Sequence, residues 1–210
     1  IPVVETVIAR DIPEAVSHAE RLGYPVALKI LSPDISHKSD VGGVALDLEN
    51  AAAVNHAGTQ MLARVKQLKP KAVIEGFTVQ QMARRPRAHE LIIGVASDPI
   101  FGPFILFGQG GTSVEVVRDR AVALPPLNMG LAAALISETR VSRLLQGYRD
   151  EPRAGLEALA LTLVQLSQLV VDLPEVAELD VNPLYADADG VLALDARIKL
   201  VASRQRGAER

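Results

Sequence analysis

The sequence contains no cysteine and no tryptophan, and its net charge at pH 7 is only −3. The absence of cysteine excludes disulfides and thiolate metal sites and is typical of a protein from a reducing cytoplasm. No apolar run approaches the ~20 residues that a membrane-spanning helix needs. The small net charge gives no electrostatic reason for nucleic acid or an anionic membrane to bind. We therefore expect a cytoplasmic protein whose partners include neither nucleic acid nor membrane.

Aromatic residues are also scarce, at 3% of the chain. The basic segment at residues 84–87 holds three arginines without aromatic neighbours, so it is typical of a solvated turn rather than a patch on which bases stack. Apolar residues make up 49% and charged residues 22% of the 210 residues, as in an ordinary globular protein. This length allows one large domain or two small lobes.

Strands and helices alternate irregularly along the chain, which predicts an α+β fold with helices backing the sheets on one side. Asp11 and Asn50 are expected helix caps, and the second helix carries an apolar stripe of Val54, Ala57, Met61, Val65 and Leu68. Helices are predicted at 11–22, 50–69, 128–137 and 156–171. Strands are predicted at 3–9, 26–30, 44–48, 72–74, 78–82, 90–95, 104–107, 114–117, 122–124, 176–181 and 191–199.

The predicted hairpin from residue 78 to residue 95 divides the chain into an N-terminal lobe, 1–88, and a C-terminal lobe, 89–200. Residues 201–210 are expected to form a linker to a further domain, and the chain itself is expected to be part of a longer polypeptide.

The loop between the strands at 26–30 and 44–48 reads S-P-D-I-S-H-K-S-D-V-G-G-V. Gly42 and Gly43 would let the backbone turn its N–H groups toward an anion. Lys38 adds a positive charge, His37 adds a titratable nucleophile, and Lys29 lies on the strand just before. A glycine pair between short strands is also typical of a plain turn, and the loop matches neither a Walker A nor a G-x-G-x-x-G pattern. The loop therefore predicts polyphosphate binding only together with other motifs.

A second group of polar residues lies near the end of the sequence. Asp180 and Asn182 share one face of a strand with Glu178, and Asp195 lies on the predicted return strand. A set of oxygen ligands without cysteine or clustered histidine suits Mg²⁺ rather than zinc. A solvent-facing acidic strand is the alternative interpretation.

Six motifs occur in one order along the chain. They are Lys29 on its strand, the loop 37–43, Gln81-Met82-Ala83, residues 90–94, residues 108–111, and residues 179–184 with 194–197. Each motif is weak alone, but together, over about residues 3–200, they resemble the ATP-grasp domain of NDP-forming acyl-CoA synthetases, relatives of the succinyl-CoA synthetase β subunit. The resemblance implies two α+β lobes that clasp ATP or ADP with Mg²⁺.

The resemblance also implies roles for single residues. Lys29 and Lys38, with the Gly42 and Gly43 N–H groups, would hold phosphates, Glu90 would reach the ribose, and His37 would relay phosphate between a phosphohistidine and ADP. Adenine would bind Gln81, Met82 and Ala83, and the metal would bind Asn182, Asp195 and Asp180. His18, His56 and His89 lack neighbouring loop glycines, so structural or solvated roles are expected for them.

The implied partners are the CoA-binding and CoA-ligase domains of the same enzyme. One alternative is a regulatory ATP-grasp module fused to a GNAT protein acetyltransferase, and another is an ATP-grasp ligase that forms amide bonds or carboxylates its substrate.

Overall fold

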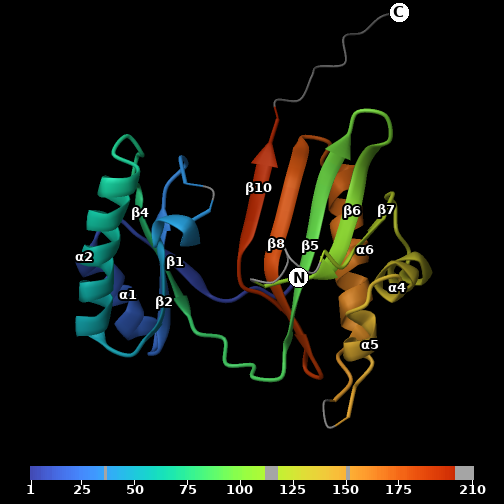
Figure 1. Cartoon of the computed structure of the whole chain (residues 1–210), viewed down its shortest axis with the longest axis horizontal. Coiled ribbons are helices and arrows are strands. Elements are labelled where there is room, and N and C mark those ends of the chain that lie inside the picture. Colours follow the sequence, from blue (N-terminus) through green and yellow to red (C-terminus); the bar gives the residue numbers. More distant parts are fainter. Residues whose placement is uncertain (36, 112–117, 150–151, 202–210) are drawn as a thin grey trace, which may run out of the picture. The chain divides into compact units, whose positions relative to one another are not determined.

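The computed structural model describes residues 1–35, 37–111, 118–149 and 152–201. These form two compact units, one of Val4–Arg84 and one that combines Ile1–Val3 with the chain from Arg85 onward. Each unit is an antiparallel sheet with helices, so the α+β prediction is confirmed (Figure 1). The units divide between Arg84 and Arg85 rather than after residue 88. Among the described helices, none is long and apolar enough to cross a bilayer.

The first unit contains a four-stranded sheet of order β1-β4-β2-β3. Helices α1 and α2 supply one side of its core, where Ala15, Ala19, Val54 and Met61 pack with the sheet. Its elements are β1 (Thr6–Ala9), α1 (Ile12–Leu22), β2 (Val26–Leu31), the 3-10 turn η1 (Ser39–Val41), β3 (Val44–Leu48), α2 (Ala51–Leu68) and β4 (Gly76–Gln81).

Local chemistry explains where α1 begins and ends. Asp11 accepts the Glu14 N–H at 2.8 Å, and the Glu14 carboxylate accepts the Arg10 N–H at 2.8 Å. The first bond satisfies an N–H group that a helix start leaves without a helical partner, and the second fixes the residue before the cap. Gly23, with φ of 85°, ends the helix. Asn50 caps α2 in the same way through the Ala53 N–H, so both predicted caps are confirmed.

Two predictions for the first unit are wrong. Leu68, placed in the buried stripe of α2, is 50% exposed because it lies in the last turn, beyond the part of the helix that covers the sheet. Residues 72–74 do not form a strand. The Val73 N–H, which a strand would need for its ladder, donates to the Asp34 carboxylate at 2.7 Å instead.

The second unit contains a sheet of order β10-β8-β5-β6-β7, with β9 paired to β8. Helix α6 packs against it through Leu159, Leu163, Leu166 and Val170, which recur at helical spacing. Its elements are β5 (His89–Asp98), β6 (Gly102–Gln109), β7 (Arg120–Ala123), α4 (Met129–Ser137), α5 (Ser142–Leu145), α6 (Leu156–Asp172), β8 (Val176–Asp187), β9 (Gly190–Ala193) and β10 (Ala196–Leu200).

Three features of this unit differ from the sequence predictions. Strands β4 and β5 lie in different sheets, so the hairpin predicted across residues 78–95 is wrong and this segment is a connection between units. The short helix α5 was not predicted. The return strand predicted at 191–199 is divided into β9 and β10, which pair with different parts of β8. The strand predicted at 114–117 lies outside the described residues.

Asp98 fixes the turn between β5 and β6. Its Oδ1 accepts the N–H groups of Phe101 at 3.0 Å and Ile100 at 2.8 Å, and these bonds, led by that from Phe101, lower the pKa of Asp98 below its usual 3.8. The turn holds Ile100 and Phe101 in solvent, 85% and 70% exposed.

We predict a pH-dependent stability difference for Asp98→Ala. Because the folded-state pKa is depressed, the charged carboxylate stabilises the fold above its unfolded-state pKa, and this contribution is lost as the pH falls through the folded-state value. The melting temperature of Asp98→Ala should therefore be lower than wild type at neutral pH, and the gap should narrow in acid. Thermal melts across this range, with Ser97→Ala as a neighbouring uncharged control, measure the gap. A gap independent of pH would show that the charge of Asp98 contributes nothing.

Candidate nucleotide and metal site

Lys29 lies on the face of the first unit's sheet that does not carry the core. Its neighbours Leu28 and Ile30 belong to the core, and residues alternate between faces along a strand. Lys29 is only 8% exposed and pairs with Val44 on β3 and Thr78 on β4. Gln80, also 8% exposed, donates to the Thr6 hydroxyl at 2.8 Å. Since burying an ammonium group is costly unless polar groups or anions accompany it, this polar face suits an anionic ligand.

Gly42 and Gly43 close the predicted phosphate loop as a tight turn. The Gly42 N–H donates to the Ser39 carbonyl at 3.0 Å, and the Gly43 N–H donates to the Lys38 carbonyl at 2.7 Å. Both N–H groups are therefore used inside the loop, and a phosphate could receive them only if the turn opened. The glycines also serve packing, because a Cβ at Gly43 would lie 2.6 Å from the Ile30 side chain and Gly42 has φ of 66°.

The side chains of the loop are more accessible than its backbone. His37 is exposed, and Lys38 is half-buried just before η1. The Gly43 N–H donates to the Lys38 carbonyl, so the backbone that carries the Lys38 side chain is held in place. A cationic side chain and an imidazole at adjacent positions can neutralise phosphate charge and accept a phosphoryl group.

The predicted adenine segment follows β4. The Met82 N–H donates to the Pro25 carbonyl at 3.1 Å, and the Gln81 side chain donates to the Leu22 carbonyl at 3.3 Å. These bonds hold Gln81 and Met82 against the end of α1 and the start of β2. Ala83 follows them, half-buried.

In the second unit, Glu90 lies where two segments distant in sequence meet. It pairs with Tyr185 across β5 and β8, and the Tyr185 hydroxyl donates to Glu90 Oε1 at 3.4 Å. Burial, followed by the nearby Glu90 charge, raises the pKa of Tyr185. The Gly110 N–H donates to the Glu90 carbonyl at 2.8 Å, and a Cβ at Gly111 would collide with the Glu90 carboxylate. Gly110 and Gly111 thus pack directly on Glu90.

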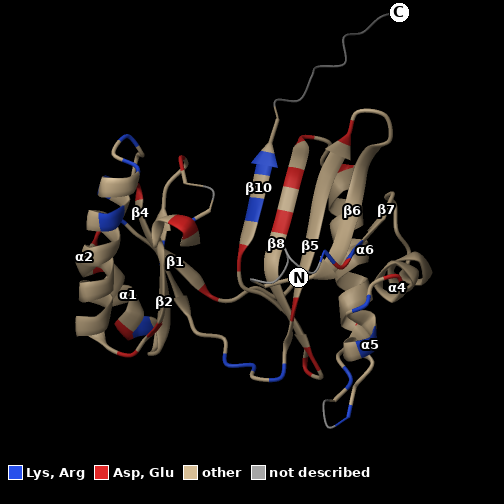
Figure 2. Cartoon of the chain, in the orientation of Figure 1, with Lys and Arg blue, Asp and Glu red and all other residues tan. Residues whose placement is uncertain are grey.

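Strand β8 presents Glu178, Asp180 and Asn182 on its outer face, between the buried Leu179 and Val181. Figure 2 shows acidic positions on β8 beside basic positions on β10. The bond from Lys199 at 2.7 Å, together with Arg197 at 3.0 Å, lowers the pKa of Glu178. Burial raises the pKa of Asp180, although the nearby Arg197 opposes this.

The break between β9 and β10 brings Asp195 beside Asn182. The Asn182 N–H donates to the Asp195 carbonyl at 3.2 Å, and the Leu194 N–H donates to the Pro183 carbonyl at 3.1 Å. The Asn182 side-chain oxygen accepts the Gly111 N–H at 3.4 Å. The backbones of Asn182 and Asp195 thus lie side by side, and Gly111 contacts the Asn182 side chain.

This donor set fits Mg²⁺. It offers oxygen ligands from Asn182 and Asp195, with Asp180 two residues from Asn182 on the same strand face. Within the described residues, no cluster of three or more His, Cys, Asp or Glu side chains could hold a metal. A site with two or three protein ligands is typical of Mg²⁺, whose remaining coordination positions are filled by water and phosphate oxygens.

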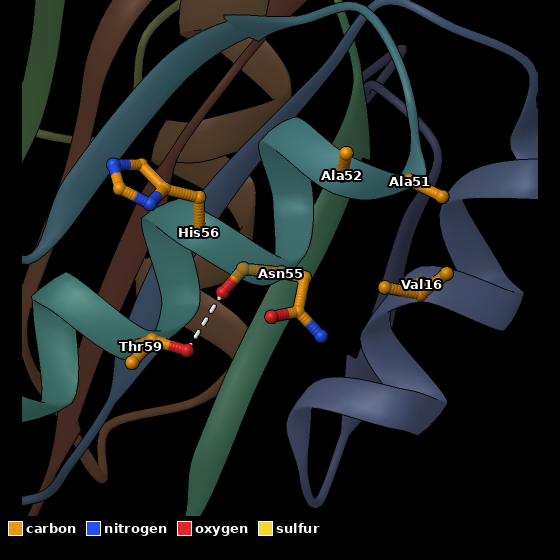
Figure 3. Close-up of a pocket in the computed structure, with 6 residues that line it drawn as sticks. All are labelled: Val16, Ala51, Ala52, Asn55, His56 and Thr59. Carbon is orange, nitrogen blue, oxygen red and sulfur yellow. Dashed lines mark hydrogen bonds between the residues drawn. The ribbon is translucent and has the colours of Figure 1, made fainter.

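A separate hollow of about 590 Å³ lies between α1 and α2 in the first unit. Val16 of α1 faces Asn55 of α2, and His56 and Thr59 come from the same helix (Figure 3). None of the predicted site residues is among those that line it. Its position on the helical side of the sheet separates it from the face that carries Lys29.

Comparison with known proteins gives the family. A profile of the ATP-grasp domain matches residues 1–200. The chain belongs to the ATP-grasp domain family. This confirms the resemblance found in the six motifs. The ATP-grasp chain is also 38% identical over 200 residues to the beta subunit of acetate–CoA ligase (ADP-forming) I from Pyrococcus furiosus. The alignment covers 95% of this chain and 85% of that subunit.

Other relatives are similar in sequence or structure. The acetate–CoA ligase (ADP-forming) I of Archaeoglobus fulgidus is 43% identical over 194 residues. This alignment covers 92% of the ATP-grasp chain but only 28% of that ligase. The dinucleotide-forming acetyl-coenzyme A synthetase 1 of Ca. Korarchaeum cryptofilum, solved with coenzyme A and Ca-AMPCP, superposes with a TM-score of 0.90 at 40% identity, covering 96% of this chain and 87% of that one. A second complex of that enzyme contains coenzyme A and Mg-AMPPCP, with a phosphohistidine segment pointing towards the nucleotide-binding site; its TM-score is 0.79 at 37% identity, over 96% and 86% of the two chains.

Proposed function

We propose that this ATP-grasp domain is the nucleotide-binding module of an ADP-forming acyl-CoA synthetase. The complete enzyme would convert acyl-CoA, ADP and phosphate reversibly to carboxylate, CoA and ATP, and would therefore be an acid–thiol ligase. The observation that carries the proposal is the similarity to the Pyrococcus furiosus beta subunit over 85% of its length. A cytoplasmic location remains part of the proposal and rests on the cysteine-free composition.

ATP or ADP would be held chiefly by cationic side chains. Lys29, buried on its polar sheet face, would meet a phosphate as a fixed point charge, and Lys38 would add a second. Gly42 and Gly43 would contribute N–H groups only after the turn opens. Adenine would lie along Gln81, Met82 and Ala83, with Glu90 at the ribose. The hydrogen bonds of Gln81 and Met82 would fix the shape of that segment rather than donate to the base.

Asn182 and Asp195, with Asp180, would hold Mg²⁺. Their oxygen donors fit the ion, and bound Mg²⁺ would neutralise charge on the transferred phosphoryl group. The Gly111 N–H would orient Asn182, because it donates to one lone pair of the side-chain oxygen and leaves the other lone pair for the ion.

His37 would carry the covalent step. Its ring would accept a phosphoryl group from a phosphohistidine of the partner domain, as one N–P bond breaks and another forms, and would then pass the group to a terminal oxygen of ADP. Its exposure on the loop beside Lys38 supports this role, because a shuttling group must be reached by both donor and acceptor.

The partners in this proposal are CoA-binding and CoA-ligase domains, in the same chain or as a separate subunit. The small share of the Archaeoglobus fulgidus ligase that the chain spans supports it. The relatives compared above are ligases and synthetases, so the alternative of a GNAT acetyltransferase module gains no support from them.

Isothermal titration calorimetry with Mg-ADP and Mg-ATP tests the proposal. We expect saturable binding that weakens when Mg²⁺ is chelated, together with a rise in melting temperature at saturating nucleotide. Neither heat nor a melting shift at millimolar Mg-ADP would refute nucleotide binding and the function built on it.

A further inference from the structure

Asp119 and Lys29 are the two buried charged side chains among the described residues. Lys29 belongs to the proposed nucleotide site, whereas none of the roles assigned above uses Asp119. A buried carboxylate is retained at a cost unless hydrogen bonds satisfy it. The bonds that satisfy Asp119 therefore show what it holds in place.

The Asp119 carboxylate ties the start of β7 to the helices. Oδ1 accepts the Arg140 N–H at 2.7 Å, and Oδ2 accepts the Val141 N–H at 2.7 Å. Both donors lie in the turn between α4 and α5, which packs into the core through Val141 and Leu145. Short bonds of this charge-assisted kind are about twice as strong as neutral ones.

The backbone of Asp119 holds the glycine segment, residues 108–111, at the end of β6. The Asp119 carbonyl accepts the Gln109 N–H at 3.0 Å, which extends the β6–β7 ladder by one residue beyond the Gly108–Arg120 pair. At Gly108 a Cβ would collide with the same carbonyl. The backbone at 108–109 is thus pressed directly against Asp119.

The next two residues of this glycine segment, Gly110 and Gly111, contact residues of the proposed site. The Gly110 N–H bonds the Glu90 carbonyl at 2.8 Å, and the Gly111 N–H bonds the Asn182 side chain at 3.4 Å. The contacts run without a gap from the α4–α5 turn through Asp119 and Gln109 to Gly111 and Asn182. The short helix α5 and its carboxylate anchor are therefore structurally connected to the proposed metal ligand.

We infer that Asp119 is a positioning residue for the nucleotide–metal site, holding the glycine segment so that Gly111 orients Asn182. The inference rests on the proposed function for what the segment positions, but the contacts of Asp119 stand independently of it. Asp119 itself would touch neither nucleotide nor metal.

Asp119→Asn tests the inference, because asparagine keeps the size but loses the charge and one acceptor. We expect the Mg²⁺ concentration that half-saturates ADP binding to rise about 3- to 10-fold, as the loss of one charge-assisted bond would give. Binding of ADP with Mg²⁺ chelated should change by less. Ser167→Ala is the matched control. The buried Ser167 hydroxyl accepts the Leu127 N–H at 2.7 Å in the same core, and this bond does not involve residues 108–111.

Hydrogen exchange without ligand provides the second measurement. The amides of Gln109, Gly110 and Gly111 should exchange faster in Asp119→Asn and at the wild-type rate in Ser167→Ala. Unchanged exchange, or an equal Mg²⁺ shift in both variants, would overturn the inference. Wild-type protein that binds no Mg-nucleotide would instead refute the proposed function, and the exchange rates would then decide the structural role alone. If Asp119→Asn does not fold, Asp119→Glu, which keeps the charge on a longer side chain, carries the same test.

Discussion

Replacing His37 with alanine should reduce phosphoryl transfer to ADP by at least about 10³-fold, as removal of a covalent nucleophile does in other enzymes. His37 is exposed, so the substitution should leave the fold and the affinity for Mg-ADP close to wild type. The complete enzyme, supplied with acetyl-CoA and radiolabelled phosphate, would be assayed for acid-labile label on this domain before ADP is added and for ATP formation afterwards.

His56→Ala is the control for this experiment. His56 is also exposed and lies in the same unit, but it lines the hollow between α1 and α2 rather than the loop. It should retain both the label and the rate of ATP formation. Acid-labile label that persists on the domain in His37→Ala would move the phosphorylated residue elsewhere.

Lys29→Met should weaken Mg-ADP binding by about 10- to 100-fold. A hydrogen bond to a charged group contributes about 1.5–3 kcal/mol, and each 1.4 kcal/mol corresponds to about tenfold in affinity. Methionine has a similar length and shape, so it should fill the buried position on β2 without the charge. Calorimetry of the variant and wild type at the same ionic strength measures the difference.

Lys66→Met controls for general loss of positive charge, because Lys66 is exposed on α2. Its affinity should match wild type. If Lys29→Met binds Mg-ADP as tightly as Lys66→Met does, Lys29 is a structural lysine and the phosphate ligand must be sought at Lys38.

Much of the fold could be predicted from local signals. The caps at Asp11 and Asn50 and the helix at 156–171 depend on short windows of sequence, and the structure confirms them. Strand pairing depends on contacts between distant residues, which no window contains. The hairpin predicted across residues 78–95 failed for this reason, because each strand is plausible alone but they join different sheets.

The order of the residue types in the site could be predicted from the sequence. Their hydrogen bonds could be predicted less well. Period-two alternation placed Asp180 and Asn182 on one face of β8 correctly. The loop pattern also suggested free N–H groups at Gly42 and Gly43, whereas these donate to carbonyls within the turn. The role of Asp119 could not be predicted, because its donors, Arg140 and Val141, are about 20 residues away in the chain and form no motif with it.

The first three residues have a mechanical consequence. The Ala193 N–H donates to the Pro2 carbonyl at 2.9 Å and Val3 bridges Ala193, so Ile1–Val3 stay with the second unit although they precede the first. The unit of Val4–Arg84 is therefore anchored at both its beginning and its end. A single proteolytic cut in this unit would leave both fragments attached to the second unit, one by the chain at Arg85 and the other by the contacts of Pro2 and Val3 with Ala193.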